Sequence, residues 1–312
     1  MKSCAPFLAW LVGLAPLVAW AQVTTVSGGT DLRAETGGED FAGVEGIFLN
    51  LRQVLTQGGA DRWIIVAQGD SGENFAHPHL YQTYAQLKGP LGRWNVRAGR
   101  FIVPFGLLAS YDSERLVLNT MEPLSLGLKL DNGIQVSGFT LDFDYAVSVT
   151  QGAAAERPVL TGRWGHEGQD LAWGASILAG RLPETASKET VELPNGVLLG
   201  VPFVDKRRLG LDATFTDGLD LWRGEVVLGT DDGRLVKGAY VEYERSLDAN
   251  WSVGANLGSW EGARSRWRVG AVVSYRVGSG ATVRAGYVDE HETAGRERTF
   301  VAQLYWEFSR AL

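Results

Sequence analysis

Apolar and polar residues alternate along most of this chain after residue 22, and this period of two constrains the fold more than any other feature. Near the C-terminus, for example, Phe300, Ala302 and Leu304 alternate with the polar residues Thr299 and Gln303. Successive side chains of a β-strand point to opposite faces, so this period predicts extended segments with one apolar and one polar face. The sequence therefore predicts an all-β fold.

Sixteen such segments can be placed, and turn residues such as Asp217-Gly218 separate them. They are expected near residues 24–35, 44–56, 61–70, 79–88, 93–101, 132–138, 140–151, 157–166, 169–182, 205–216, 219–230, 234–246, 249–260, 264–277, 280–291 and 297–308. A tilted strand that spans a membrane needs about 9–11 residues, which most of them have. An even number suits a closed barrel with both chain ends on one side. Fourteen strands is the alternative if segment 132–138 pairs differently.

The two faces of these segments differ in a way that favours a membrane barrel over a soluble sandwich. Aromatic residues recur on the apolar face near segment ends, where a membrane meets water: Trp63, Trp94, Trp222, Trp251, Trp267, Tyr275 and Phe308. The opposite face carries ionisable residues, including Arg97, Asp142, Asp144, Arg268 and Arg284. A water-filled lumen tolerates such a face, whereas a packed core does not. We predict a transmembrane antiparallel β-barrel; alternation alone leaves a β-sandwich as the alternative.

The connections between the segments differ in length on the two sides of the predicted barrel. Short turns such as Glu167-Gly168 and Leu247-Asp248 fall on one side. The three longest connections, Asp70–Pro78, Ile102–Asp131 and Pro183–Val204, all fall on the other side. Outer-membrane barrels have short periplasmic turns and long outer loops, so we place the long connections outside the cell.

The first 21 residues have the anatomy of a secretory signal peptide. Lys2 precedes an apolar run, Ala5–Ala19, and the small-x-small pattern Ala19-Trp20-Ala21 suits cleavage before Gln22. A membrane-anchoring helix is the alternative, but the run is shorter than the roughly 20 residues that a spanning helix needs, and Pro16 interrupts it. We therefore expect an exported chain with its barrel in residues 22–312, located in the outer membrane.

Composition excludes several classes of function. Cleavage removes one of the 29 basic residues and none of the 36 acidic ones, so the mature net charge is −8. Nucleic-acid binding rests on a basic surface and is not expected. The single cysteine, Cys4, is lost with the signal peptide, so no disulfide or thiol chemistry remains. His77-Pro78-His79 has no further ligand at a known metal spacing, and we expect neither a metal nor a cofactor.

One short stretch resembles a known family. It runs Gly99-Arg100-Phe101-Ile102-Val103-Pro104-Phe105-Gly106 and opens the longest connection. This stretch resembles the matching segment of phosphate-selective and related outer-membrane porins, the porin O/P type. The resemblance implies a barrel of sixteen strands, commonly a homotrimer, whose third outer loop folds inward to narrow the pore. The phosphate-selective members use many basic residues along the pore, whereas the mature chain has only five lysines. Phosphate selectivity is therefore not carried over.

These features together predict a porin that lets small hydrophilic solutes or ions diffuse passively across the outer membrane, with membrane lipid around it. The loop 102–131 is expected to form the constriction. Asp112, Glu114 and Arg115 on this loop should face three arginines of the wall, and opposed charges would set the selectivity of the channel. The three are Arg97, Arg268 and Arg284, and Asp142 and Asp144 are expected as further lumen residues that face the arginines.

Two other classes of function stay open at this point. The first is a structural barrel that holds a partner protein or an electron carrier in the outer membrane. The second is a barrel enzyme, for which Ser113 and His166 are the residues to test. A serine nucleophile needs a paired base, and no histidine lies at suggestive spacing from Ser113, so we predict that the chain is not an enzyme.

Overall fold

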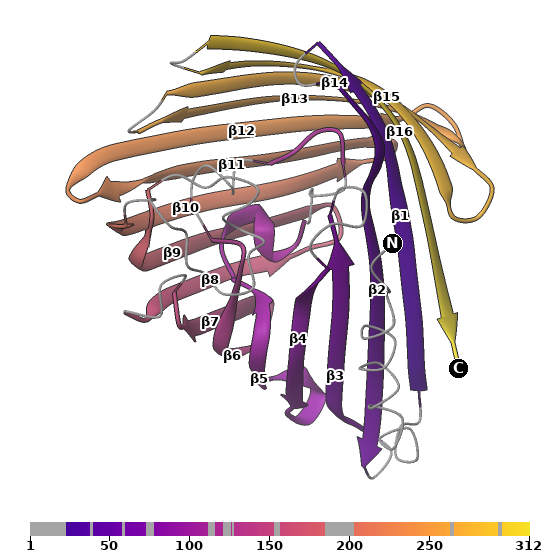
Figure 1. Ribbon diagram of the computed structural model, residues 1–312. Helices are drawn as coiled ribbons and strands as arrows, with labels where there is room; N and C mark the ends of the chain where they lie inside the picture. The colour runs from indigo at the N-terminus through magenta and orange to yellow at the C-terminus, as the bar shows by residue number, and fades with distance from the viewer. Residues whose placement is uncertain are drawn as a thin grey trace.

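The chain folds as a closed barrel of sixteen antiparallel strands in a computed structural model (Figure 1). The structure describes residues 23–37, 40–57, 60–72, 78–111, 116–120, 126, 128–152, 157–184, 203–262, 265–292 and 295–312. The predicted signal peptide, residues 1–21, lies outside these ranges. All sixteen predicted strands are confirmed, and the alternative of fourteen is excluded because β6 pairs with both of its neighbours.

The strands follow one another around the barrel in chain order. Their bounds are β1 (Val23–Thr36), β2 (Phe41–Gln57), β3 (Ala60–Ser71), β4 (His79–Lys88), β5 (Asn95–Ile102), β6 (Leu130–Thr140), β7 (Phe143–Thr150), β8 (Val159–Glu167), β9 (Leu171–Pro183), β10 (Phe203–Asp217), β11 (Asp220–Asp231), β12 (Arg234–Ser246), β13 (Trp251–Glu261), β14 (Arg266–Val277), β15 (Ala281–Glu292) and β16 (Gly295–Ala311). Two short 3-10 helices, η3 (Pro90–Gly92) and η4 (Gly106–Ala109), complete the described secondary structure. No helix in the described ranges is long and apolar enough to cross a membrane.

The first and last strands close the barrel. β1 pairs with β16 from Thr25 opposite Ala311 to Thr36 opposite Phe300. Closure leaves no strand edge with unpaired backbone N–H and C=O groups, which hydrocarbon could not satisfy. The pairing of the two ends therefore makes a membrane-spanning sheet possible.

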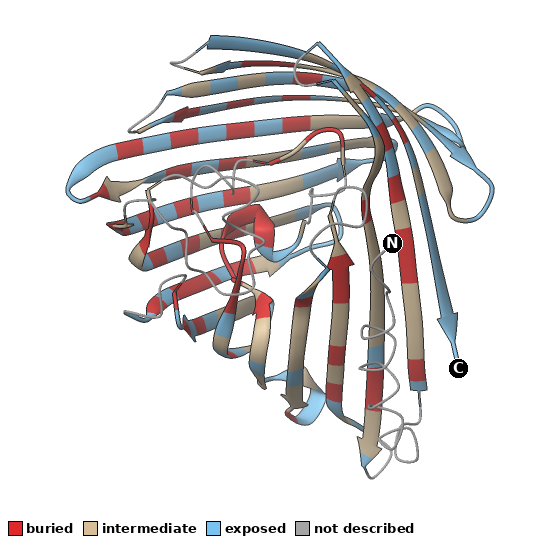
Figure 2. Ribbon diagram, viewed as in Figure 1, coloured by how far each residue is buried: buried red, intermediate tan, exposed pale blue. Residues whose placement is uncertain are grey.

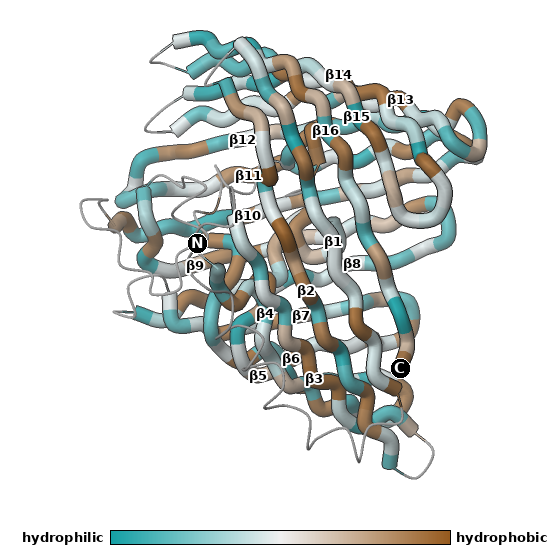
Figure 3. The backbone as a smooth tube through the Cα atoms, turned by 45° about the vertical axis from the view of Figure 1, so that its right-hand side comes forward, coloured by the Kyte–Doolittle hydropathy of each residue, from teal (hydrophilic) through white to brown (hydrophobic). Residues whose placement is uncertain are grey.

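The two faces of the barrel carry opposite chemistry, as the alternation predicts. In β10, Arg208 and Asp212 are buried on the inner face, whereas Leu209 and Leu211 are each 64% exposed on the outer face. Buried and exposed bands alternate along the strands in Figure 2, and hydrophobic and hydrophilic positions alternate in Figure 3. All seven aromatic residues that the sequence places at an interface are exposed. Six of them lie at the end with the short turns, and Trp267 lies at the other end.

One predicted boundary differs in a way that matters for the lumen. The sequence places a turn at Phe139-Thr140 and Asp142 on the following strand. The turn is instead Leu141-Asp142, with Leu141 in the left-handed region at φ 55°. β6 continues two residues further than predicted because Phe139 keeps its place on the exposed apolar face. Asp142 is therefore an exposed turn residue, and its place on the lumen wall is corrected.

The two faces predict different responses to substitution by arginine. Val136, near the middle of β6, is exposed on the outer face, and its neighbour Ser137 faces the lumen. Val136→Arg should lower the free energy of unfolding in lipid vesicles by on the order of 2 kcal/mol, because it places a charge in hydrocarbon. Ser137→Arg is the control and should change this free energy little. Urea titration of vesicle-inserted protein measures both, and equal losses in the two variants would contradict the assignment of the faces.

Candidate functional site

The described residues of the long connection between β5 and β6, which are 103–111, 116–120, 126 and 128–129, lie inside the barrel and pack on its inner wall. Its apolar residues form the largest hydrophobic cluster of the described chain together with wall residues from β8 to β13. The members are Val103, Phe105, Leu107, Leu108, Leu126, Leu128, Val159, Leu178, Leu182, Val227, Val236, Tyr240 and Trp260. Figure 1 shows η4 inside the barrel, against β9, β10 and β11. Burial of these side chains supplies the main favourable free energy that holds the loop inside.

The start of η4 is anchored by polar contacts to the wall. The backbone N–H of Gly106 donates to Ser176 Oγ at 2.9 Å, and the N–H of Leu107 donates to Glu225 Oε1 at 3.4 Å. Gly106 has φ 53°, and a Cβ atom there would overlap the Glu225 carboxylate. Only glycine meets both conditions, since it adopts this φ without strain and leaves room for the acid.

The other residues of the stretch Gly99–Gly106 lead the chain from β5 into the lumen. Gly99 has φ 129°, and a Cβ atom there would overlap the backbone of β4. Phe101 is fully buried, and Pro104 and Phe105 are buried as well. Arg100 donates from Nε to the carbonyl oxygen of Tyr81 at 3.2 Å. The stretch thus ends β5 and turns the chain inward.

Tyr111 fixes the next part of the loop. Its hydroxyl donates to Glu242 Oε1 at 3.0 Å, and the Arg223 guanidinium lies 3.9 Å from the centre of its ring. Arg223 also forms an ion pair with Glu242. The tyrosine is therefore held both by a hydrogen bond to a charged acceptor and by a cation over its ring.

A second apolar contact lies further round the wall. Val117 and Leu118 pack with Val301, Val272 and Val288 of β14 to β16. Two wall glycines leave room for this contact. A Cβ atom at Gly286 would lie 2.6 Å from Val117 Cγ1, and one at Gly270 would lie 2.6 Å from Leu118 Cδ2. The apolar anchors of the described loop thus extend from β8 to β16, and the inner face of β1 to β7 forms the rest of the wall.

Several wall arginines are neutralised by acidic neighbours. Arg163 pairs with Asp212 at 2.8 Å and with Asp144 at 3.0 Å. Its side chain crosses β9 at Gly174, where a Cβ atom would overlap the guanidinium. Arg268 pairs with Glu290 at 2.6 Å. These arginines lie inside local networks of opposite charge and add little net field to the lumen.

Two wall arginines are held by neutral partners instead. Arg97 donates to Gln86 Oε1 at 2.9 Å and lies 4.3 Å from the centre of the Tyr84 ring. It forms no ion pair with any carboxylate in the described ranges. An amide oxygen and a ring face hold the guanidinium in place, and neither carries a negative charge. The positive charge of Arg97 therefore acts on the lumen.

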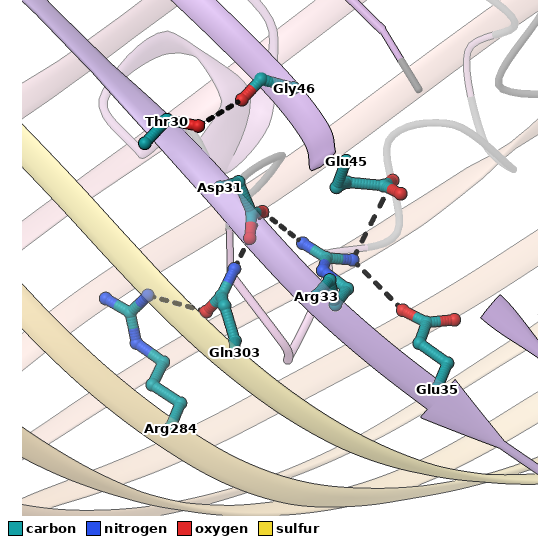
Figure 4. A network of polar contacts seen from close by, with 8 residues as sticks. All are labelled: Thr30, Asp31, Arg33, Glu35, Glu45, Gly46, Arg284 and Gln303. Carbon is teal, nitrogen blue, oxygen red and sulfur yellow. Dashed lines mark hydrogen bonds and ion pairs between the residues drawn. The ribbon is translucent and has the colours of Figure 1, made fainter. Parts of the chain in front are cut away.

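Arg284 repeats this arrangement on β15. It donates to Gln303 Oε1 at 2.7 Å, and its guanidinium lies 5.5 Å from the centre of the Tyr305 ring. Gln303 in turn donates to Asp31, which pairs with Arg33 at 2.7 Å. Figure 4 shows this chain of contacts, in which Gln303 separates Arg284 from the carboxylate. Among the described residues Arg284, like Arg97, has no ion-pair partner.

The sequence therefore located some of the lumen residues and missed others. Arg97, Asp144, Arg268 and Arg284 lie on the inner wall, whereas Asp142 does not. Asp112, Ser113, Glu114 and Arg115 lie outside the described residues. The alternation also places Ser176, Glu225 and Glu242 on the inner face. Nothing in the sequence indicated that they hold the loop at Gly106, Leu107 and Tyr111.

Of the two residues named for a barrel enzyme, Ser113 and His166, the structure describes only His166. His166 lies at the exposed end of β8, and its Nδ1 is 2.5 Å from the carbonyl oxygen of Asp142. No group of three or more His, Cys, Asp or Glu side chains in the described residues could hold a metal ion.

Solved structures with the same architecture complete the description. An anion-selective porin from Comamonas acidovorans superposes with a TM-score of 0.73 at 13% identity, over 92% of this chain and 100% of that chain. The chain has the fold of a porin barrel. OmpF of Salmonella typhi gives a TM-score of 0.66 at 10% identity, over 91% of this chain and 97% of that chain. A trimer form of the Vibrio cholerae outer membrane protein OmpT gives 0.66 at 11% identity, over 91% and 98%.

These likenesses are structural only. No family model matches the chain, and no curated protein matches it in sequence. The phosphate-selective type that the short stretch resembles is not confirmed by the comparisons. The shared feature is the sixteen-stranded barrel, which does not by itself define a solute or the selectivity of a channel. Any selectivity depends on the residues that line this lumen.

The contact between Val117 and Gly286 makes a sharp test of the loop position. A Cβ atom at Gly286 would lie 3.6 Å from Val117 Cβ, within the range that a disulfide needs. The double variant V117C/G286C should therefore form a disulfide on oxidation, seen as a mobility shift on a non-reducing gel. In the control V117C/A285C the second cysteine faces the opposite side of the sheet, so no disulfide should form. Equal cross-linking in both variants would contradict the docked loop.

Proposed function

We propose that the chain is an outer-membrane porin through which small hydrophilic solutes or ions diffuse down their gradients. The observation that carries this proposal is a closed barrel whose outer face is apolar, whose inner face is polar, and whose longest loop packs inside. Export by a signal peptide at residues 1–21 and insertion of residues 22–312 into the outer membrane fit this role. The structural neighbours support it, since one of them is an anion-selective porin and another is a trimer form of an outer membrane protein. A homotrimer is part of the proposal.

Solutes would pass between the loop 102–131 and the wall of β1 to β7. On that wall, Arg97 of β5 contributes a cation without a paired carboxylate. Arg284 contributes a second one from β15, where it lies two residues from the loop contact at Gly286 and connects through Gln303 to Asp31 of β1. On the loop, Asp112, Glu114 and Arg115 are proposed to complete the constriction. Charges that line a channel set its selectivity, so the two arginines should favour anions although the mature chain is acidic overall.

Conductance of the purified mature protein in planar bilayers tests the pore. Stepwise openings that persist without added partner protein are the expected result, because the wall offers a continuous polar face to water. A folded barrel that gives no steps, and that co-purifies with a partner at fixed stoichiometry, would contradict the pore and favour a scaffold.

Replacement of the two arginines tests the proposed selectivity. Arg97→Gln combined with Arg284→Gln should lower the ratio of anion to cation permeability by about two- to fivefold, as expected for charges acting over several ångströms in water. The reversal potential in a salt gradient measures this ratio. Arg245→Gln is the control, because Arg245 lies outside the lumen beside Asp220 at 3.3 Å. An equal shift in the control would show that the two lumen sites do not set the selectivity.

A further inference from the structure

The outward face of β14 to β16 carries a patch of basic and aromatic residues at its outer end, the end with the long loops. Three rows of directly paired residues lie there, one below the other. They are Trp267, His291 and Arg296, then Val269, Asp289 and Arg298, then Ala271, Tyr287 and Phe300. We call these nine residues the rim patch. It is polar and basic at the loop end and apolar towards the middle of the barrel.

The rim patch faces away from the lumen. Val288 packs with the inward loop residue Val117, so the next residue, Asp289, points outward. Phe300 is exposed on the outer face, and Arg298 lies two residues before it on the same face of β16. The rim patch is therefore a surface that lipid can reach.

The charges of the rim patch leave two cations accessible. Arg296 donates from Nε to Asp289 Oδ1 at 2.8 Å, and Arg298 Nε lies 3.7 Å from Asp289 Oδ2. One carboxylate thus serves two guanidinium groups. The side chains of Arg296 and Arg298 are 46% and 57% exposed, whereas that of Asp289 is 10% exposed. The surface presents an excess of positive charge.

The level of the rim patch matches that of a lipid headgroup. Trp267 and Tyr275 mark the two ends of the outer face of β14 and are eight residues apart. At about 3.3 Å per residue and a tilt of about 40°, they are separated by roughly 20 Å along the membrane normal, near the height of the apolar band of such barrels. Arg296 lies in the row of Trp267, with its guanidinium 5.9 Å from the centre of that ring. The two arginines therefore lie at the outer interface.

We propose that the rim patch binds the phosphate of an anionic lipid in the outer leaflet, with its acyl chains against Ala271, Tyr287 and Phe300. Guanidinium groups match phosphate oxygens in geometry and charge, and basic surface groups at this level attract anionic headgroups. The gradient from basic to apolar along the three rows fits a lipid, whose acyl chains would contact the apolar row. A free anion would contact only the basic residues. The proposal rests on the membrane orientation in the proposed function, but not on an open pore.

Native mass spectrometry of the full mature protein in detergent tests the proposal with defined probes. Phosphatidylglycerol is the anionic lipid, phosphatidylcholine with the same acyl chains is the zwitterionic comparison, and inorganic phosphate is the free anion. The variant R296Q/R298Q should bind phosphatidylglycerol about thirtyfold less tightly, since each of the two basic groups at a membrane surface contributes about 1 kcal/mol and 1.4 kcal/mol is a factor of about ten. Its binding of phosphatidylcholine should not change. Asp289→Asn should strengthen binding of phosphatidylglycerol, because the competing carboxylate charge is removed.

A matched control lies at the other end of the same outer face. Arg245 and Arg310 are outward residues near the short turns, so R245Q/R310Q removes two charges without touching the rim patch. An equal loss in this control would overturn the proposal in favour of unspecific attraction. Unchanged binding in R296Q/R298Q, weaker binding in Asp289→Asn, or displacement of the lipid by millimolar inorganic phosphate would also overturn it.

Conductance, recorded for every variant, separates this proposal from that of the pore. R296Q/R298Q should conduct like the unmodified protein, which shows that the barrel is intact. A barrel that binds phosphatidylglycerol at the rim patch but gives no conductance would contradict the pore alone.

Discussion

The pairing of β1 with β16 is the interaction on which the rest of the structure depends. Hydrocarbon offers no hydrogen bonds, so a sheet in a membrane must satisfy every backbone group internally, and only closure removes both edges. Closure in turn gives every strand one outer and one inner face, which in the proposed outer-membrane porin meet lipid and the lumen. The alternation of Leu209 and Leu211 with Arg208 and Asp212 follows from that division. The same geometry creates an interior that is too wide for wall side chains alone to fill.

The inward loop partly fills this interior and explains the exceptions to alternation. Val227, Val236 and Val301 are apolar on a face that is otherwise polar, and each packs in a cluster with loop residues. Glycines take the place of larger residues on the inner face where a side chain would block the approach of the loop. Gly286, which lies beneath Val117, is an example. The wall and the loop therefore match each other in shape and polarity from β8 to β16, and this leaves the remaining strands to carry the polar surface of the passage.

The sequence predicted the barrel well because period two, turn residues and interface aromatics are local signals that recur along the chain. It predicted the site less well. Gly106 stood out only through a family resemblance, and Glu225, which a Cβ atom there would overlap and which accepts the N–H of Leu107, lies 119 positions from Gly106 in the chain. Nothing local distinguishes a lumen acid that accepts a loop N–H from one that faces water. The predicted place of Asp142 on the lumen wall was wrong for a different reason. The turn lies two residues later than predicted, and this moves the Asp142 side chain off the strand.

The charge of the whole chain is a poor guide to the charge that a solute meets. The acidic excess of the mature chain includes surface acids such as Asp205, Asp232 and Glu261, which are exposed and lie near the outer loops. In the lumen the acids mostly hold arginines, as Asp212 holds Arg163. The field of an arginine held by glutamine is not offset by its partner, whereas the field of an arginine paired with a carboxylate is largely offset at distances longer than the separation of the pair. Selectivity therefore depends on which partners the wall arginines have rather than on how many arginines there are.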